Sequence, residues 1–65
     1  MFCEPVLIAK RPGGVAYYVY HRPGVGWNMH PAFKPPRDMA SWGGYKRVDS
    51  MLALRGFTLD DLRLN

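Results

Sequence analysis

The chain has 65 residues, including nine Lys or Arg and five Asp or Glu, which gives a net charge of +4. A chain of this length forms one domain, residues 1–65, and buries only about 60% of its unfolded surface. The single cysteine excludes an internal disulfide, and one thiol alone cannot form a structural zinc site.

The positive charge is concentrated in the first half of the chain. No Asp or Glu occurs between Pro5 and Arg37, whereas from Asp38 onward four acids balance four bases. A basic segment with interleaved aromatic residues is typical of a surface that meets anionic partners. Five scattered bases can also serve only to keep a small protein soluble.

The first ten residues, MFCEPVLIAK, do not resemble a signal peptide, because they contain an acid and only a short apolar run. No apolar run is long enough to cross a bilayer, so we expect no membrane association. Together with the lone thiol, these features predict a cytoplasmic protein.

Residues 5–10 and 15–21 are predicted strands joined by a Pro-Gly-Gly turn. A turn centred on Gly13 and Gly14 would place Ile8 opposite Val19, and a turn centred on Pro12 and Gly13 would place it opposite Tyr17. The two registers differ by two residues and therefore give the same two faces. A three-residue loop would invalidate this conclusion about the faces.

One predicted face is β-branched and is the better core candidate, and the other carries two large amphipathic rings. Tyr18 and Tyr20 lie on the second face, where they can meet a partner or simply pack across strands with their hydroxyls in water. The first face holds Val6, Ile8, Val15, Tyr17 and Val19, and the second holds Leu7, Ala9, Ala16, Tyr18 and Tyr20.

A third short strand is predicted over Val25–Met29, after the second Pro-Gly turn, with Trp27 and Met29 on one face. The proline-rich segment that follows is expected to be extended. Phe33 and Trp42 are the residues expected to attach it to the core.

The C-terminal third shows helical spacing of Tyr45, Val48, Met51, Leu52 and Arg55. Gly56 is placed to end this helix, with Phe57 touching Leu52 in a Schellman motif. Thr58 and Asp61 have capping-box spacing for a second short helix, with Leu59 and Leu62 on its inner side.

These elements predict an α+β fold: a small two- or three-stranded antiparallel meander packed against a C-terminal helix, followed by a short terminal helical turn. The hairpin edges would be open, so a homodimer formed through an edge or a tyrosine face is possible.

Nothing in the sequence marks an enzyme. Cys3, His21 and His30, with Asp38 as a fourth ligand, show neither a nucleophile–base arrangement nor a repeated metal-ligand spacing. The glycines lie between predicted strands, so they do not form a phosphate loop before a helix. We therefore expect no catalytic residues, no metal and no cofactor.

Two binding functions remain. The first is a nucleic-acid-associated module with stacking by Tyr18, Tyr20 and Trp27 and phosphate contacts from Lys10, Arg11, Arg22, Lys34 and Arg37. The second is a protein-binding accessory or inhibitor of the mobile-element type, docking through the Tyr18/Tyr20 face or a strand edge.

Overall fold

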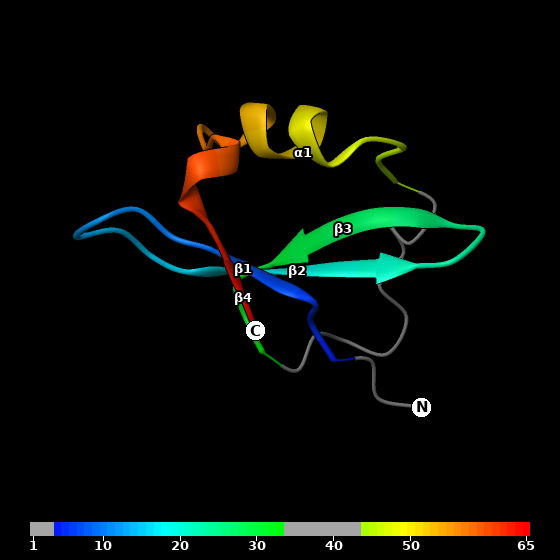
Figure 1. The fold of residues 1–65 in the computed structure, drawn as a ribbon, viewed down its shortest axis with the longest axis horizontal. Helices are drawn as coiled ribbons and strands as arrows, with labels where there is room; N and C mark the ends of the chain where they lie inside the picture. The colour runs from blue at the N-terminus through cyan, green and yellow to red at the C-terminus, as the bar shows by residue number, and fades with distance from the viewer. Residues whose placement is uncertain (1–3, 34–43) are drawn as a thin grey trace.

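The computed structural model describes residues 4–33 and 44–65 and shows a four-stranded antiparallel sheet with a helix across one face (Figure 1). This arrangement confirms the α+β class and the C-terminal helix packed on the sheet. The strand order is β3-β2-β1-β4. In chain order the elements are β1 Leu7–Ala9, β2 Tyr17–Arg22, β3 Gly26–His30, helix α1 Val48–Leu54, the 3-10 turn η2 Leu59–Asp61 and β4 Leu62–Leu64.

Both Arg-Pro-Gly copies form the same kind of turn. Gly14 N–H donates to the Arg11 carbonyl at 2.9 Å, and Val25 N–H donates to the Arg22 carbonyl at 3.0 Å. Proline at the second position and a glycine with positive φ at the third, +75° and +79° in the two copies, are typical of a type II turn. In the second hairpin three residues, 23–25, lie between the paired Arg22 and Gly26, and in the first hairpin seven residues, 10–16, lie between the paired Ala9 and Tyr17. Both loops therefore have an odd number of residues.

The odd loop length shifts the register of the first hairpin by one residue from both predicted registers. Ile8 lies opposite Tyr18 and Leu7 opposite Val19, so the predicted pairing of Ile8 with Val19 or Tyr17 is wrong. Because side chains alternate along a strand, the shift moves Leu7 and Ala9 to the core face and Ile8 away from it. Tyr17 and Val19 remain on the core face, as predicted.

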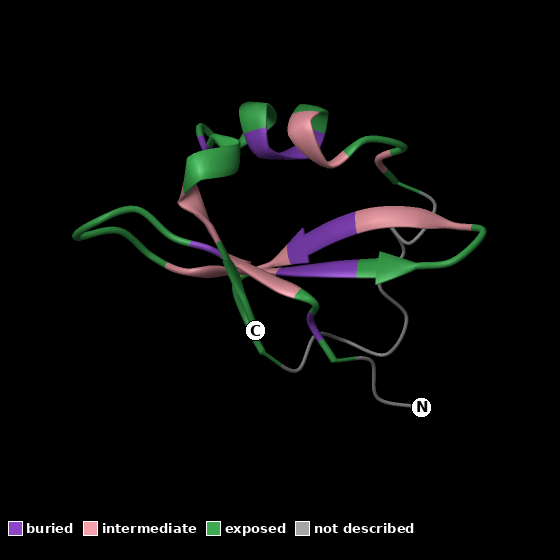
Figure 2. Ribbon diagram, viewed as in Figure 1, coloured by how far each residue is buried: buried purple, intermediate pink, exposed green. Residues whose placement is uncertain are grey.

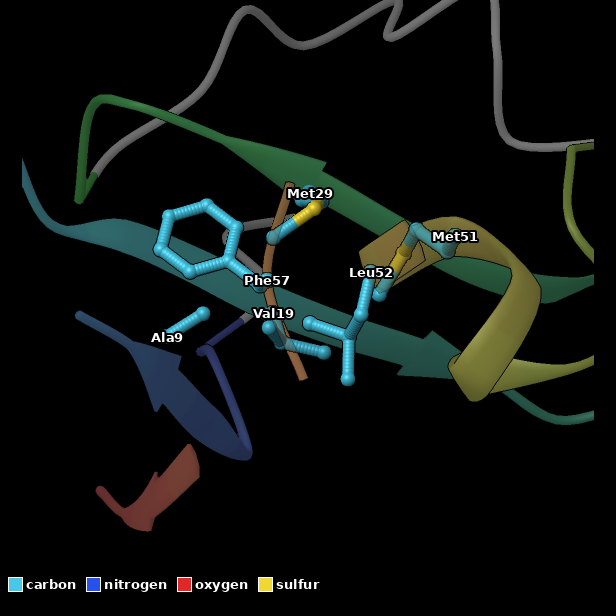
Figure 3. Packing of buried hydrophobic residues seen from close by; sticks show 6 residues of the cluster. All are labelled: Ala9, Val19, Met29, Met51, Leu52 and Phe57. Carbon is cyan, nitrogen blue, oxygen red and sulfur yellow. The ribbon is translucent and has the colours of Figure 1, made fainter. Parts of the chain in front are cut away.

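The core lies between this sheet face and α1. Figure 3 shows side chains from both hairpin strands, β3, α1 and the loop after it packed together. The prediction that Trp27 and Met29 share a face is confirmed, since Met29 is in the core and Trp27 packs against it. The buried cluster consists of Ala9, Val19, Met29, Met51, Leu52 and Phe57.

The end of α1 follows the predicted Schellman geometry. Phe57 N–H donates to the Leu52 carbonyl at 2.9 Å, Gly56 N–H donates to the Ala53 carbonyl at 3.1 Å, and Gly56 has a φ of +82°. The motif turns the chain back so that Phe57 enters the core beside Leu52.

The capping box is also present, since Thr58 N–H donates to Asp61 Oδ2 at 2.8 Å. The chain then leaves the 3-10 turn as strand β4, which pairs with β1 and was not predicted. The expectation that Leu59 faces inward is wrong, because it is 59% exposed, whereas Leu62 packs against the core.

The face of the sheet opposite α1 is partly covered by the chain that follows β3. The Tyr20 hydroxyl donates to the carbonyls of Ala32 and Phe33, at 3.1 and 2.6 Å. Phe33 is 41% exposed and packs edge-on against Tyr18, so it contacts this face and not the helix-side core. The predicted core contact of Trp42 lies outside the described residues.

Figure 2 shows the buried positions where the sheet meets the helix, with the hairpin loop and the outer side of the helix exposed. Within residues 4–33 and 44–65 no helix is both long and apolar enough to span a membrane.

Candidate anion-binding site

The β1–β2 loop, the end of α1 and the start of β4 lie at the same end of the sheet (Figure 1), and these segments carry four basic residues. Lys10 and Arg11 follow β1, Arg55 ends α1, and Arg63 lies in β4. We call Lys10, Arg11, Arg55 and Arg63 the basic end. Lys10, Arg11 and Arg63 line one pocket together with Pro12.

Two aromatic rings connect the arginines of the basic end. The Arg11 guanidinium lies over the Phe57 ring, 5.4 Å from its centroid, and the Arg55 guanidinium lies over the Tyr17 ring at 5.6 Å. The two rings meet edge-on, with centroids 5.7 Å apart. This chain of contacts positions the guanidiniums of Arg11 and Arg55 by their attraction to the ring faces. Neither guanidinium has a hydrogen-bond partner among the described residues, so their N–H groups can meet other acceptors.

No carboxylate neutralises these four cations among the residues that the structure describes. Among the described residues the ion pair joins Arg47 Nη2 to Asp49 Oδ2, 2.7 Å apart, at the start of α1 and away from the basic end. Hydrogen bonding to Arg47 lowers the pKa of the Asp49 carboxyl, and the same contact raises the pKa of Arg47. The ion-paired acid Asp49 is therefore away from the basic end, and Asp60 and Asp61, which lie beside it, form no ion pair with its cations.

Arg63 is held by backbone contacts. Its Nη1 donates to the carbonyl of Asp60 at 2.9 Å and to the carbonyl of Leu62 at 2.8 Å. These bonds fix the guanidinium beside β4 and leave its remaining N–H groups for an outside acceptor. A guanidinium fixed in this way loses less conformational entropy when it binds an anion.

The predicted phosphate-contacting residues do not form one surface. Lys10 and Arg11 belong to the basic end, but Arg22 ends β2 at the opposite end of the hairpin. A strand rises about 3.3 Å per residue, so Arg22 lies roughly 17 Å along β2 from Tyr17. Lys34 and Arg37 lie outside the described residues.

The predicted stacking residues also separate. Tyr20 is 0% exposed, so the expectation that it stacks on a base is wrong: the ring is enclosed and its hydroxyl is hydrogen-bonded. Tyr18 is half-buried beside Phe33 on the face away from α1. Trp27 packs against the core beside His21, near the end of the sheet opposite Lys10.

Sequence reasoning missed Arg55 and Arg63, because the C-terminal half has a balanced charge count. The available signal was positional: Arg55 precedes a helix-ending glycine, and Arg63 follows Asp61, the last residue of the capping box. The pairing of β4 with β1, which brings Arg63 toward Lys10, has no such signal.

Among residues 4–33 and 44–65, no three or more His, Cys, Asp or Glu side chains group in a way that could hold a metal ion. Comparisons with protein-family models, with curated proteins and with solved structures find no match for this chain.

Proposed function

We propose that this protein is a small non-enzymatic module that binds nucleic acid through phosphate contacts made by its basic end. The observation that carries the proposal is the convergence of Lys10, Arg11, Arg55 and Arg63, from three parts of the sequence, without a carboxylate partner among the described residues. Clustered lysines and arginines on one surface are the usual electrostatic signature of nucleic-acid binding. The lone thiol suits a reducing compartment, which is why we place this function in the cytoplasm.

The aromatic contacts favour phosphate recognition over base stacking. Guanidiniums already occupy positions over the Tyr17 and Phe57 rings, and Phe57 is buried. The rings therefore orient Arg11 and Arg55, whose N–H groups suit phosphate oxygens. Phosphate contacts position a protein on nucleic acid without reading its sequence, so we expect little base preference.

The second candidate is a protein-binding accessory, and the observation that favours it is the Tyr18–Phe33 pair. These rings pack edge-on at 5.4 Å on the face away from α1, and Phe33 is partly exposed. Aromatic residues of this kind often anchor protein interfaces. Tyr20 no longer belongs to this surface, because it is enclosed.

Docking through a strand edge has less support. Trp27, on the outer edge of β3, exchanges backbone hydrogen bonds with Tyr45, and Met29 N–H donates to Asn28 Oδ1 at 2.9 Å. On β4, Leu62 N–H donates to the Leu59 carbonyl, and its own carbonyl accepts from Arg63. Strand addition would have to displace these partners.

The proposal is tested by measuring the fluorescence anisotropy of labelled single- and double-stranded DNA and RNA over a series of salt concentrations. Arg55→Ala should weaken binding about equally for different sequences. It should reduce the slope of log K against log salt by about 0.9 for duplex DNA, or about 0.7 for single strands, if one phosphate contact is lost.

Lys46→Ala is the matched control, since it removes one exposed positive charge away from the basic end. It should leave the slope nearly unchanged. If the wild-type protein binds no DNA or RNA in a salt-dependent way at micromolar concentration, the nucleic-acid proposal is wrong. The Tyr18–Phe33 face would then become the better candidate site.

A further inference from the structure

A small pocket lies within the basic end, between the start of the β1–β2 loop and β4. It has a volume of about 220 Å³ and is lined by Lys10, Arg11, Pro12 and Arg63. Three of its four lining residues are cations: Lys10 and Arg11 follow β1, and Arg63 lies in β4, which is distant in sequence. This space corresponds to several water molecules, enough for one phosphate group and part of what it is attached to.

The pairing of β1 with β4 brings Lys10 toward Arg63. Ile8 lies directly opposite Arg63, and Lys10 N–H donates to the Asp61 carbonyl at 3.1 Å, which continues the pairing beyond β1. Lys10 has the same strand parity as Ile8, so Lys10 and Arg63 are diagonal neighbours on one face of the sheet. Such neighbours are about 7–8 Å apart, a separation that two long side chains can close around one anion.

The nearby acids do not cancel this charge. The Asp61 carboxylate accepts from Thr58 N–H at 2.8 Å and belongs to the capping box. Asp60 holds Arg63 through its backbone carbonyl, and its carboxylate forms no ion pair with the lining cations. Lys10, Arg11 and Arg63 therefore outnumber the two acids of this corner.

We infer that the pocket is a subsite for a terminal phosphate, the phosphomonoester at the end of a nucleic-acid strand. This inference rests on the proposed function. A phosphodiester within a strand carries one charge and continues in both directions, whereas a terminal phosphate carries about −1.5 to −2 near neutral pH and has three free acceptor oxygens. Lys10 and Arg63 on one face of the sheet, with Arg11 lining the same pocket, match the charge of the terminal group better.

The test compares one single-stranded oligonucleotide sequence with a 5′-phosphate, with a 3′-phosphate and with hydroxyl ends, by competition against a labelled strand. Wild-type protein should bind a phosphorylated end about threefold to tenfold more tightly than the hydroxyl form. In Lys10→Ala and Arg63→Gln proteins this ratio should fall to nearly one. Gln at residue 63 keeps an N–H donor for the carbonyls beside β4 while it removes the charge.

Lys46→Ala should lower the affinity for all three oligonucleotides slightly and keep their ratio. Adenosine monophosphate and inorganic phosphate serve as further competitors, because they carry a monoester or free phosphate without a strand. If either competes as strongly as the phosphorylated oligonucleotide, the pocket serves a small phosphorylated ligand and the assignment to a strand end is wrong.

The inference and the proposed function fail in different ways. Salt-dependent binding with equal affinity for all three ends would overturn the terminal-phosphate subsite and leave phosphate-backbone binding intact. Absence of binding to every oligonucleotide would overturn both. The wild-type ratio is measured without any substitution, so the test does not depend on the folding of a variant.

Discussion

Tyr20 shows how one side chain can be given the wrong role by a pattern that is otherwise correct. Its place on the face away from α1 follows from strand alternation, and the sequence indicates that correctly. Its burial follows from the chain after β3, which crosses that face and presents the carbonyls of Ala32 and Phe33 to the hydroxyl. A contact between residues twelve or thirteen apart, with the rest of the β2–β3 hairpin between them, has no local sequence pattern that could predict it.

The buried hydroxyl of Tyr20 gives a direct prediction. Tyr20→Phe removes the donor to the carbonyls of Ala32 and Phe33, so the free energy of unfolding should fall by about 1–3 kcal/mol. Nucleic-acid affinity should be unchanged in the folded protein, because an enclosed ring cannot stack on a base. Urea denaturation followed by circular dichroism measures the first quantity, and anisotropy measures the second.

Tyr18→Phe is the matched control, because the Tyr18 hydroxyl has no hydrogen-bond partner among the described residues. Its stability should stay within about 0.5 kcal/mol of the wild type. If the free energy of unfolding falls equally in Tyr20→Phe and Tyr18→Phe, the hydrogen bonds to Ala32 and Phe33 do not hold the chain after β3 on the sheet.

At the scale of elements, prediction works where the signal is local. The three-residue stop of α1, with Arg55, Gly56 and Phe57, and the Thr58–Asp61 capping box use residue types and spacings that define these motifs by themselves. The core stripe of the helix is equally local, because Met51 and Leu52 lie one turn from Val48.

Strand register and β4 are not local in this sense. The two Arg-Pro-Gly turns were recognised as turns, but their loop length decides which face is buried, and a change of one residue exchanges the faces. Strand β4 has only three residues, Leu62–Leu64, and pairs with a strand more than fifty residues earlier. A three-residue strand is too short to show alternation, so only the tertiary pairing reveals it.

Gly56 allows the helix end to be tested alone. An alanine at residue 56 would adopt a φ of +82°, in the left-handed region, whereas its Cβ would meet only Arg11 Nη2 at 3.7 Å, an ordinary contact. The cost is therefore one of backbone conformation, and Gly56→Ala should lower the free energy of unfolding by about 1 kcal/mol or more.

Thermal denaturation of Gly56→Ala beside Gly56→Asn tests this reason. Asparagine tolerates the left-handed region better than alanine, so Gly56→Asn should retain more of the wild-type stability. An unchanged melting temperature in Gly56→Ala, or an equal decrease in the melting temperature of both variants, would contradict the conformational explanation.

At the scale of the whole molecule, the charge is divided by position in space and not by halves of the sequence. The acid-free first half contributes Lys10 and Arg11 to the basic end but sends Arg22 to the other end of the hairpin. The balanced second half contributes Arg55 and Arg63. The sequence could predict a basic surface, but its members depend on the sheet order β3-β2-β1-β4.

The same sheet order decides whether the molecule can pair with another copy of itself. Outer strands present unpaired backbone groups, which are a common route to dimers and aggregates. Here Tyr45 and Asn28 engage groups along the outer edge of β3, and Arg63 covers carbonyls beside β4. A net charge of +4 adds repulsion between copies. We therefore predict a monomer in solution, in place of the homodimer that the sequence leaves possible.

Substitution of Arg63 should allow the monomer to associate. Arg63→Ala uncovers the carbonyls of Asp60 and Leu62 beside a strand whose last residue, Leu64, is 86% exposed. It also removes one positive charge, which weakens the repulsion between copies. Sedimentation velocity over a range of micromolar concentrations should then show a concentration-dependent increase in mass that the wild type lacks.

Lys10→Ala removes the same charge without uncovering the edge, so it should remain monomeric. Association of both variants would assign the effect to charge alone, and association of the wild type would show that the Arg63 contacts do not protect β4.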